Sequence, residues 1–61
     1  MDEFVEHDQV IVDDKRLGTI IYIYSNGHTM EVEYLDGEIE TVSINRIQIA
    51  YSWVLYFQFL L

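Results

Sequence analysis

The sequence predicts a small all-β domain built from five short, strongly curved strands, followed by an apolar C-terminal extension. Runs of β-branched and aromatic residues alternate with turn signals, and proline is absent from the 61 residues. Two of the turn signals are the dipeptides Asn26-Gly27 and Asp36-Gly37. Such dipeptides between strand-forming runs are strong hairpin signals, because type I′ turns need positive φ at both central residues. A chain of this length forms one domain with a small core.

The strand-forming runs set the predicted boundaries. They place strands at 8–13, 18–25, 28–35, 38–43 and 46–50, with a loop at 13–17 and a short turn at 43–46. The domain is therefore expected to occupy residues 1–50. Residues 51–61 form the extension, as a sixth strand or as an arm that mediates oligomerisation.

Two-residue turns at both dipeptides would also determine the strand register. They predict the pairs Ile23–Met30, Ile21–Val32, Leu35–Glu38, Tyr34–Ile39, Glu33–Glu40 and Val32–Thr41. One face of the sheet then carries the predicted core, which is Ile21, Ile23, Met30, Val32, Tyr34, Ile39 and Thr41. The other face carries Ile20, Tyr22, Tyr24, Glu31, Glu33 and Glu40. Strong curvature of the second strand would instead bury Tyr22 or Tyr24.

Several short motifs follow one another in an order found in a known class of small domains. They are QVIVD at 9–13, Gly18-Thr19-Ile20, MEVEY at 30–34, an Asp-Gly turn and ETVS at 40–43. Over residues 8–50 this pattern resembles the small SH3-like, KOW-type β-barrels, particularly short bacterial and phage-type domains of uncharacterised function. The resemblance implies a five-stranded SH3-like barrel with a general protein-interaction role. The KOW domains of transcription and translation factors contact nucleic acid or ribosomes through basic residues.

The charge of this chain argues against such a nucleic-acid role. There are 11 acidic and 3 basic residues, which gives a formal net charge of -8. Lys15, Arg16 and Arg46 are too few to neutralise a phosphate backbone or an anionic membrane surface. Lys15 and Arg16 either offset the neighbouring Asp13 and Asp14 or pair with a partner. The charge favours a protein partner with a basic or apolar surface.

The residues that carry catalytic or metal chemistry are sparse. Cysteine is absent, which excludes disulfides and thiolate metal sites, and His7 and His28 are too few for a structural zinc site. Ser25, Ser43 and Ser52 lie in no nucleophile-elbow motif. The sequence therefore predicts no enzyme, no cofactor and no metal site.

The two ends of the chain bear on its location. The first residues, MDEFVEHDQ, are acidic and lack the features of a secretory signal, which leads us to expect a cytoplasmic protein, or one in the host cytoplasm if the source is viral. The apolar stretch from Ile47 to Leu61 would span only about 22 Å as a helix, which is short of a bilayer crossing.

The extension YSWVLYFQFLL is almost entirely apolar and aromatic. Read as a strand, it places six large side chains on one face, namely Tyr51, Trp53, Leu55, Phe57, Phe59 and Leu61. Burial of these side chains would stabilise a small domain by on the order of 10 kcal/mol before the entropic cost of ordering them. We therefore predict that they mediate self-association with a second copy. The alternative is that they fold back on their own domain.

These observations lead to a functional hypothesis and two alternatives. The hypothesis is a non-enzymatic, homo-oligomeric module that modulates or inhibits a partner protein. Its predicted partner-binding residues are Tyr22, Tyr24, Glu31, Glu33 and Glu40. One alternative is a nucleic-acid mimic that inhibits a host defence nuclease or helicase, and the other is a structural subunit of a larger assembly.

Overall fold

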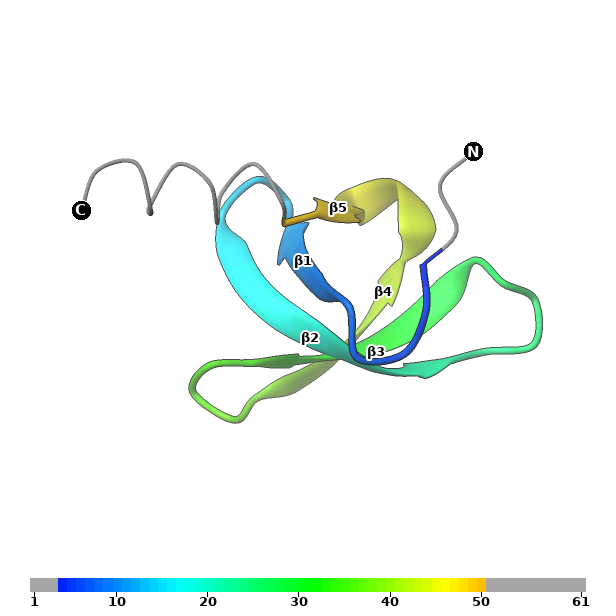
Figure 1. Ribbon diagram of the computed structural model, residues 1–61, viewed down its shortest axis with the longest axis horizontal. Helices are drawn as coiled ribbons and strands as arrows, with labels where there is room; N and C mark the ends of the chain where they lie inside the picture. The colour runs from blue at the N-terminus through cyan, green and yellow to red at the C-terminus, as the bar shows by residue number, and fades with distance from the viewer. Residues whose placement is uncertain (1–3, 51–61) are drawn as a thin grey trace.

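The computed structural model describes residues 4–50, which form a single antiparallel sheet of five strands (Figure 1). The strands are β1 (Gln9–Val12), β2 (Arg16–Ile23), β3 (Thr29–Tyr34), β4 (Ile39–Ser43) and β5 (Ile47–Ile49), and a 3-10 turn, η1 (Ile44–Arg46), precedes β5. Their order in the sheet is β4-β3-β2-β1-β5. The prediction of a small all-β domain with five strands is confirmed.

The sheet curls around its core but is not closed. β5 pairs with β1, while β4 pairs only with β3, so β4 and β5 are the two edges. Figure 1 shows β1, β2, β4 and β5 surrounding a common interior, and it shows the β2–β3 and β3–β4 turns extending to opposite sides. The described residues therefore form an open, curved sheet. The predicted sixth strand lies outside them.

The loop between β1 and β2 contains two consecutive left-handed residues. Asp13 has a φ of 53° and Asp14 a φ of 59°, and Lys15 N donates to Val12 O at 3.0 Å. Aspartate occupies this region more readily than most residues, because its short polar side chain bonds locally. This tight turn sets the pairing of Val12 with Arg16.

A bulge in β2 divides the predicted register into a correct part and a wrong part. Ile23 pairs with Met30, as predicted, but a register shift then leaves Ile21 without a pairing partner in β3. Ile20, rather than Ile21, pairs with Val32. As a result Ile20 is fully buried and Ile21 is 37% exposed, so the prediction that Ile21 lies in the core was wrong. A bulge inserts one extra residue and thereby exchanges the two faces of the strand beyond it.

The turn at Asp36-Gly37 is one residue longer than predicted. Gly37 N donates to Tyr34 O at 2.9 Å, and Tyr34 N donates to Glu38 O at 2.8 Å, which makes residues 35–37 the loop. Of its residues only Gly37, with a φ of 93°, is left-handed. A type I′ turn requires two such residues, whereas a three-residue hairpin needs only one, usually glycine.

The longer loop moves the register of β4 by one residue. Glu33 pairs with Ile39 and Val32 with Glu40. The predicted pairs Leu35–Glu38, Tyr34–Ile39, Glu33–Glu40 and Val32–Thr41 are therefore wrong. Ile39 is 54% exposed and Thr41 is exposed, while Val42 takes their expected place in the core.

The core fills the concave side of the sheet. Its buried members are Val10, Val12, Ile20, Met30, Val32, Tyr34, Val42 and Ile47, with Phe4, Ile23 and Ile44 packed against them. The segment before β1 is bonded to the bulged strand, because His7 N donates to Ile20 O at 2.7 Å and Ile20 N donates to Asp8 O at 3.0 Å. These two bonds extend the pairing of β1 with β2 toward the N-terminus.

Candidate partner-binding face

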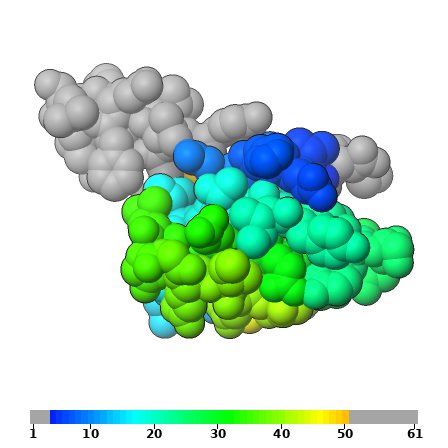
Figure 2. Space-filling view, turned by 90° about the horizontal axis from the view of Figure 1, so that it is seen from below, coloured from blue at the N-terminus to red at the C-terminus, as the bar shows by residue number. Residues whose placement is uncertain are grey.

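Four of the five predicted partner-binding residues lie together on the convex side of the sheet. Tyr22 pairs with Glu31 across β2 and β3, and Glu33 follows Glu31 on the same side of β3. The rings of Tyr22 and Tyr24 meet edge to face, with their centroids 5.0 Å apart. Tyr22, Tyr24, Glu31 and Glu33 are called the tyrosine–glutamate face below. Figure 2 views the molecule from below, where side chains of β2, β3 and β4 form a continuous surface.

Two hydroxyl groups hold the carboxylate of Glu31. The hydroxyl of Tyr24 donates to Glu31 Oε2, and Thr41 Oγ1 lies 2.9 Å from both carboxylate oxygens. The hydrogen bond to Glu31 raises the pKa of the Tyr24 hydroxyl. Thr41 was predicted to be a core residue, so its part in this face follows from the shifted register. The three side chains form an ordered polar centre for the face.

The rest of the face is accessible to a partner. Tyr22 is 50% exposed, and Glu33 is also exposed. Ile21 and Ile39 are exposed beside them, so apolar surface borders the carboxylates. Exposed aromatic and aliphatic side chains next to carboxylates that have no ion-pair partner are a feature of protein-binding surfaces.

The two arginines of the described chain form ion pairs away from the tyrosine–glutamate face. Arg16 pairs with Glu38 at 3.0 Å and with Asp36 at 3.5 Å. Arg46 pairs with Asp13 at 2.6 Å. Within residues 4–50 no basic side chain forms an ion pair with the tyrosine–glutamate face. The negative charge of this face is therefore not neutralised by its neighbours.

Glu40, the fifth predicted residue, lies apart from the other four. It accepts a hydrogen bond of 2.6 Å from the hydroxyl of Tyr34 and lies 3.3 Å from Arg46 Nη2. The hydrogen bond from Tyr34 and the nearby charge of Arg46 lower the pKa of Glu40. Burial, together with the bond to Glu40, raises the pKa of Tyr34 to about 12. Glu40 thus contributes to a set of internal polar contacts rather than to the tyrosine–glutamate face.

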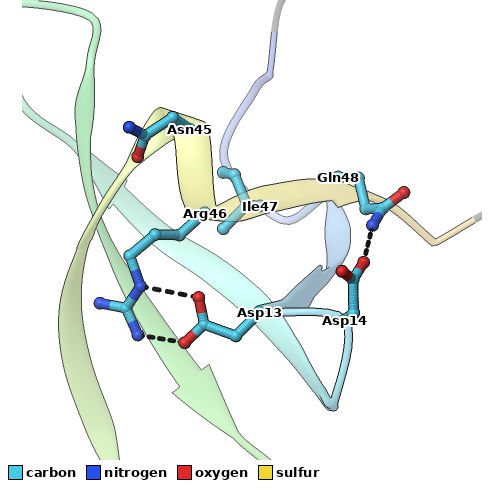
Figure 3. Close-up of a pocket in the computed structure, with 6 residues that line it drawn as sticks. All are labelled: Asp13, Asp14, Asn45, Arg46, Ile47 and Gln48. Carbon is cyan, nitrogen blue, oxygen red and sulfur yellow. Dashed lines mark hydrogen bonds and ion pairs between the residues drawn. The ribbon is translucent and has the colours of Figure 1, made fainter.

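Arg46 joins three separate parts of the chain. Its Nε and Nη2 bind the two carboxylate oxygens of Asp13 at 3.0 and 2.6 Å, as Figure 3 shows. Gln48 Nε2 donates a single hydrogen bond to Asp14 Oδ1. A bidentate pair such as that of Arg46 with Asp13 orients both side chains. The sequence offered no signal for these contacts, because Asp13 and Arg46 are 33 positions apart.

The hollow beside Arg46 does not present a free binding group. Its volume is about 230 Å³, and it is lined by Asp13, Asp14, Asn45, Arg46, Ile47 and Gln48. In its wall Asp13 is bonded to Arg46 and Asp14 is bonded to Gln48 (Figure 3). A second hollow lies where the guanidinium of Arg16 stacks on the ring of Tyr34, 3.6 Å from the ring centroid. These hollows are structural features of the turns.

The Asp13–Arg46 pair predicts a pH-dependent contribution to stability. The hydrogen bond from Arg46 lowers the pKa of Asp13 from its usual value of 3.8 in the folded state. A lowered folded-state pKa stabilises the protein above the unfolded pKa, and the effect is lost as the pH falls through the folded pKa. Wild type should therefore be more stable than Asp13→Asn at neutral pH, and this difference should shrink toward zero in acid strong enough to protonate Asp13 in the folded state.

Urea unfolding of both proteins at the two pH values would measure this difference. Asparagine also tolerates a left-handed backbone, so the substitution leaves the turn intact. The same difference in unfolding free energy at both pH values would contradict the assigned role of the ion pair.

In residues 4–50 no group of three or more histidine, aspartate or glutamate side chains is placed to hold a metal ion. No helix in this part of the chain has the length and apolar character needed to cross a bilayer. The predicted self-association residues from Tyr51 to Leu61 lie outside the described residues.

Comparison with known proteins adds no family assignment. Searches against protein-family models, curated proteins and solved structures found no match. The candidate face is therefore interpreted from its own geometry and charge.

Proposed function

We propose that this protein is a non-enzymatic protein-binding module that uses the tyrosine–glutamate face to engage a partner with a basic surface. The observation that carries the proposal is the gathering of two tyrosines and two glutamates on one convex surface that no arginine or lysine of residues 4–50 neutralises. In this proposal the module self-associates through Tyr51, Trp53, Leu55, Phe57, Phe59 and Leu61, and it modulates or inhibits the partner.

Both the charge and the exposed aromatic area of this face favour binding. A net charge of -8 accelerates the encounter with a basic surface, and exposed carboxylates determine the orientation of docking. The tyrosine rings provide apolar area with few rotatable bonds, so their burial costs little entropy. Because Glu31 is already held by Tyr24 and Thr41, the centre of the face needs little reordering on binding.

Affinity capture from the native host with matched variants tests the proposal. Tyr22→Ala removes a half-exposed side chain from the face, and Leu35→Ala removes one that is 84% exposed at the tip of the β3–β4 turn. We expect wild type and Leu35→Ala to retain the same protein and Tyr22→Ala to lose it. Equal retention by all three proteins, or retention of nothing specific, would count against this face.

Charge alone supports a second candidate, mimicry of nucleic acid. The described arginines are paired internally, which leaves several exposed carboxylates without a counterion from the chain. A mimic would inhibit a basic nucleic-acid enzyme, and its inhibition would weaken steeply as salt is added. Inhibition that is insensitive to salt would argue against mimicry.

We also propose that this open, curved sheet belongs to the SH3-like barrel class of folds. Support comes from the meander of β1 to β4, the return of β5 to pair with β1, and the η1 turn that leads into β5.

A further inference from the structure

The outer edge of β4 carries a row of backbone groups without partners in the described chain. Tyr34 N bonds Glu38 O and Ile44 N bonds His28 O, both at 2.8 Å, and the pairing between these points is regular. In an antiparallel pair the bonded residues alternate along each strand. The backbone groups of Ile39, Thr41 and Ser43 therefore point away from β3, and none of them is bonded within residues 4–50.

This edge carries only one of the features that usually prevent strand addition, an inward-pointing charge. Natural edge strands carry a proline, a lysine, a bulge or an inward-pointing charge, or they are very short. β4 has five residues, no bulge, and neither proline nor lysine. The inward-pointing charge is Glu40, and its bonds to Tyr34 and Arg46 neutralise it within the domain. Ile39, at the start of the strand, is 54% exposed.

The charge around β4 restricts what can pair with it. Glu31 and Glu33 lie on the neighbouring strand, and Glu38 precedes β4. Pairing of β4 with β4 of another copy would bring like charges together, which is destabilising. Residues 51–61 contain no charged side chain and alternate in a pattern that suits a strand. This segment can approach the acidic edge without repulsion.

Length and direction favour a segment from another copy. Eleven extended residues span about 36 Å, and the five residues of β4 span about 17 Å, so the segment covers the edge and leaves a linker. η1 joins the end of β4 to the start of β5, and β5 then runs away from β4 toward Ala50 (Figure 1). A segment from the same chain would need to reverse its direction to reach β4.

We infer that the outer edge of β4 accepts residues 51–61 of a second copy of the chain as an additional strand. This inference rests on the proposed self-association and names its acceptor site. Main-chain hydrogen bonds to Ile39, Thr41 and Ser43 would provide the pairing, as in other cases of strand addition. If each copy donates and accepts one strand, the assembly closes as a symmetric dimer.

Sedimentation equilibrium of the full chain at micromolar concentration tests the inference. Thr41→Pro removes the outward backbone N–H of Thr41 without breaking a backbone bond to β3. Thr41→Val is the control, because it also lacks the hydroxyl that bonds Glu31 but keeps the backbone N–H. We expect Thr41→Val to associate like wild type and Thr41→Pro to raise the dissociation constant by at least about tenfold. Thermal unfolding would verify that each variant is folded, and Ile39→Lys provides a second test of the same edge.

The outcomes separate the inference from the proposed function. Equal association of Thr41→Pro, Ile39→Lys and wild type would overturn β4 as the acceptor and leave self-association intact. A full-length Leu55→Asp variant that still associates would overturn residues 51–61 as the donated strand. A monomeric wild type would overturn both the inference and self-association.

Discussion

Ile20→Ala is expected to lower the free energy of unfolding by about 2 to 4 kcal/mol, whereas Ile21→Ala should cost less than about 1 kcal/mol. The reason is the bulge in β2, which buries Ile20 completely and leaves Ile21 37% exposed. A domain of this size has only about 3 to 5 kcal/mol of stability, so the first variant should be largely unfolded. Urea denaturation followed by circular dichroism would measure both values.

The two neighbouring isoleucines provide a matched pair, because the substitutions remove the same atoms. An unbulged strand with the pairing Ile21–Val32 predicts the opposite order of effects. Equal losses, or a larger loss at Ile21, would show that the bulge is wrongly placed.

Gly18→Ala is expected to destabilise the fold by about 1 to 3 kcal/mol through overpacking. A Cβ atom at this position would lie 2.5 Å from Val32 Cγ1 and 3.1 Å from Glu33 O. Val32 is fully buried, so its side chain has no free space into which it can move. The glycine is needed here because β2 and β3 approach closely, and not because of its backbone angles. Thermal and urea unfolding of the variant would measure the loss.

A double-mutant cycle identifies the contact responsible. Val32→Ala removes the methyl group nearest to the new Cβ, so Gly18→Ala should cost less in that background than in wild type. Additive effects of the two substitutions would mean that the clash with Val32 does not cause the loss.

The fold class was predictable because several local signals agree. β-branched runs, glycine-containing turns and alternating burial each indicate strands, and the tight turns leave no room for crossover helices. The positions of the strands in the sequence are close to those predicted. Their pairing in the sheet was less predictable, since a one-residue change in a loop or strand exchanges the faces.

The positions of the bulge in β2 and of the longer β3–β4 turn explain which predicted partner-binding residues lie together. Tyr22 and Tyr24 lie on the turn side of the bulge, where the predicted register with β3 holds. Glu31 and Glu33 belong to β3, whose faces were predicted correctly. Glu40 belongs to β4, which the longer turn shifts by one residue, and it therefore joins Tyr34 and Arg46 on the other side.

The contacts of Arg46 could not have been predicted from the sequence. They require the β1–β2 turn to meet β4 and η1 in space, and Asp13 lies 33 positions from Arg46 along the chain. No local propensity or periodicity encodes such a meeting. The left-handed backbone of Asp13 could not be predicted either, because no glycine marks that turn.

We propose that the tyrosine–glutamate face, and not the total charge, binds the partner. The most direct test is the dissociation constant of the captured protein for Glu33→Gln and Glu6→Gln, measured by calorimetry at one salt concentration. The two substitutions remove the same charge from exposed residues, but only Glu33 belongs to the tyrosine–glutamate face. We predict that Glu33→Gln weakens binding by about tenfold and that Glu6→Gln leaves it within about twofold of wild type. Equal weakening by both variants would contradict the claim and indicate recognition of charge alone.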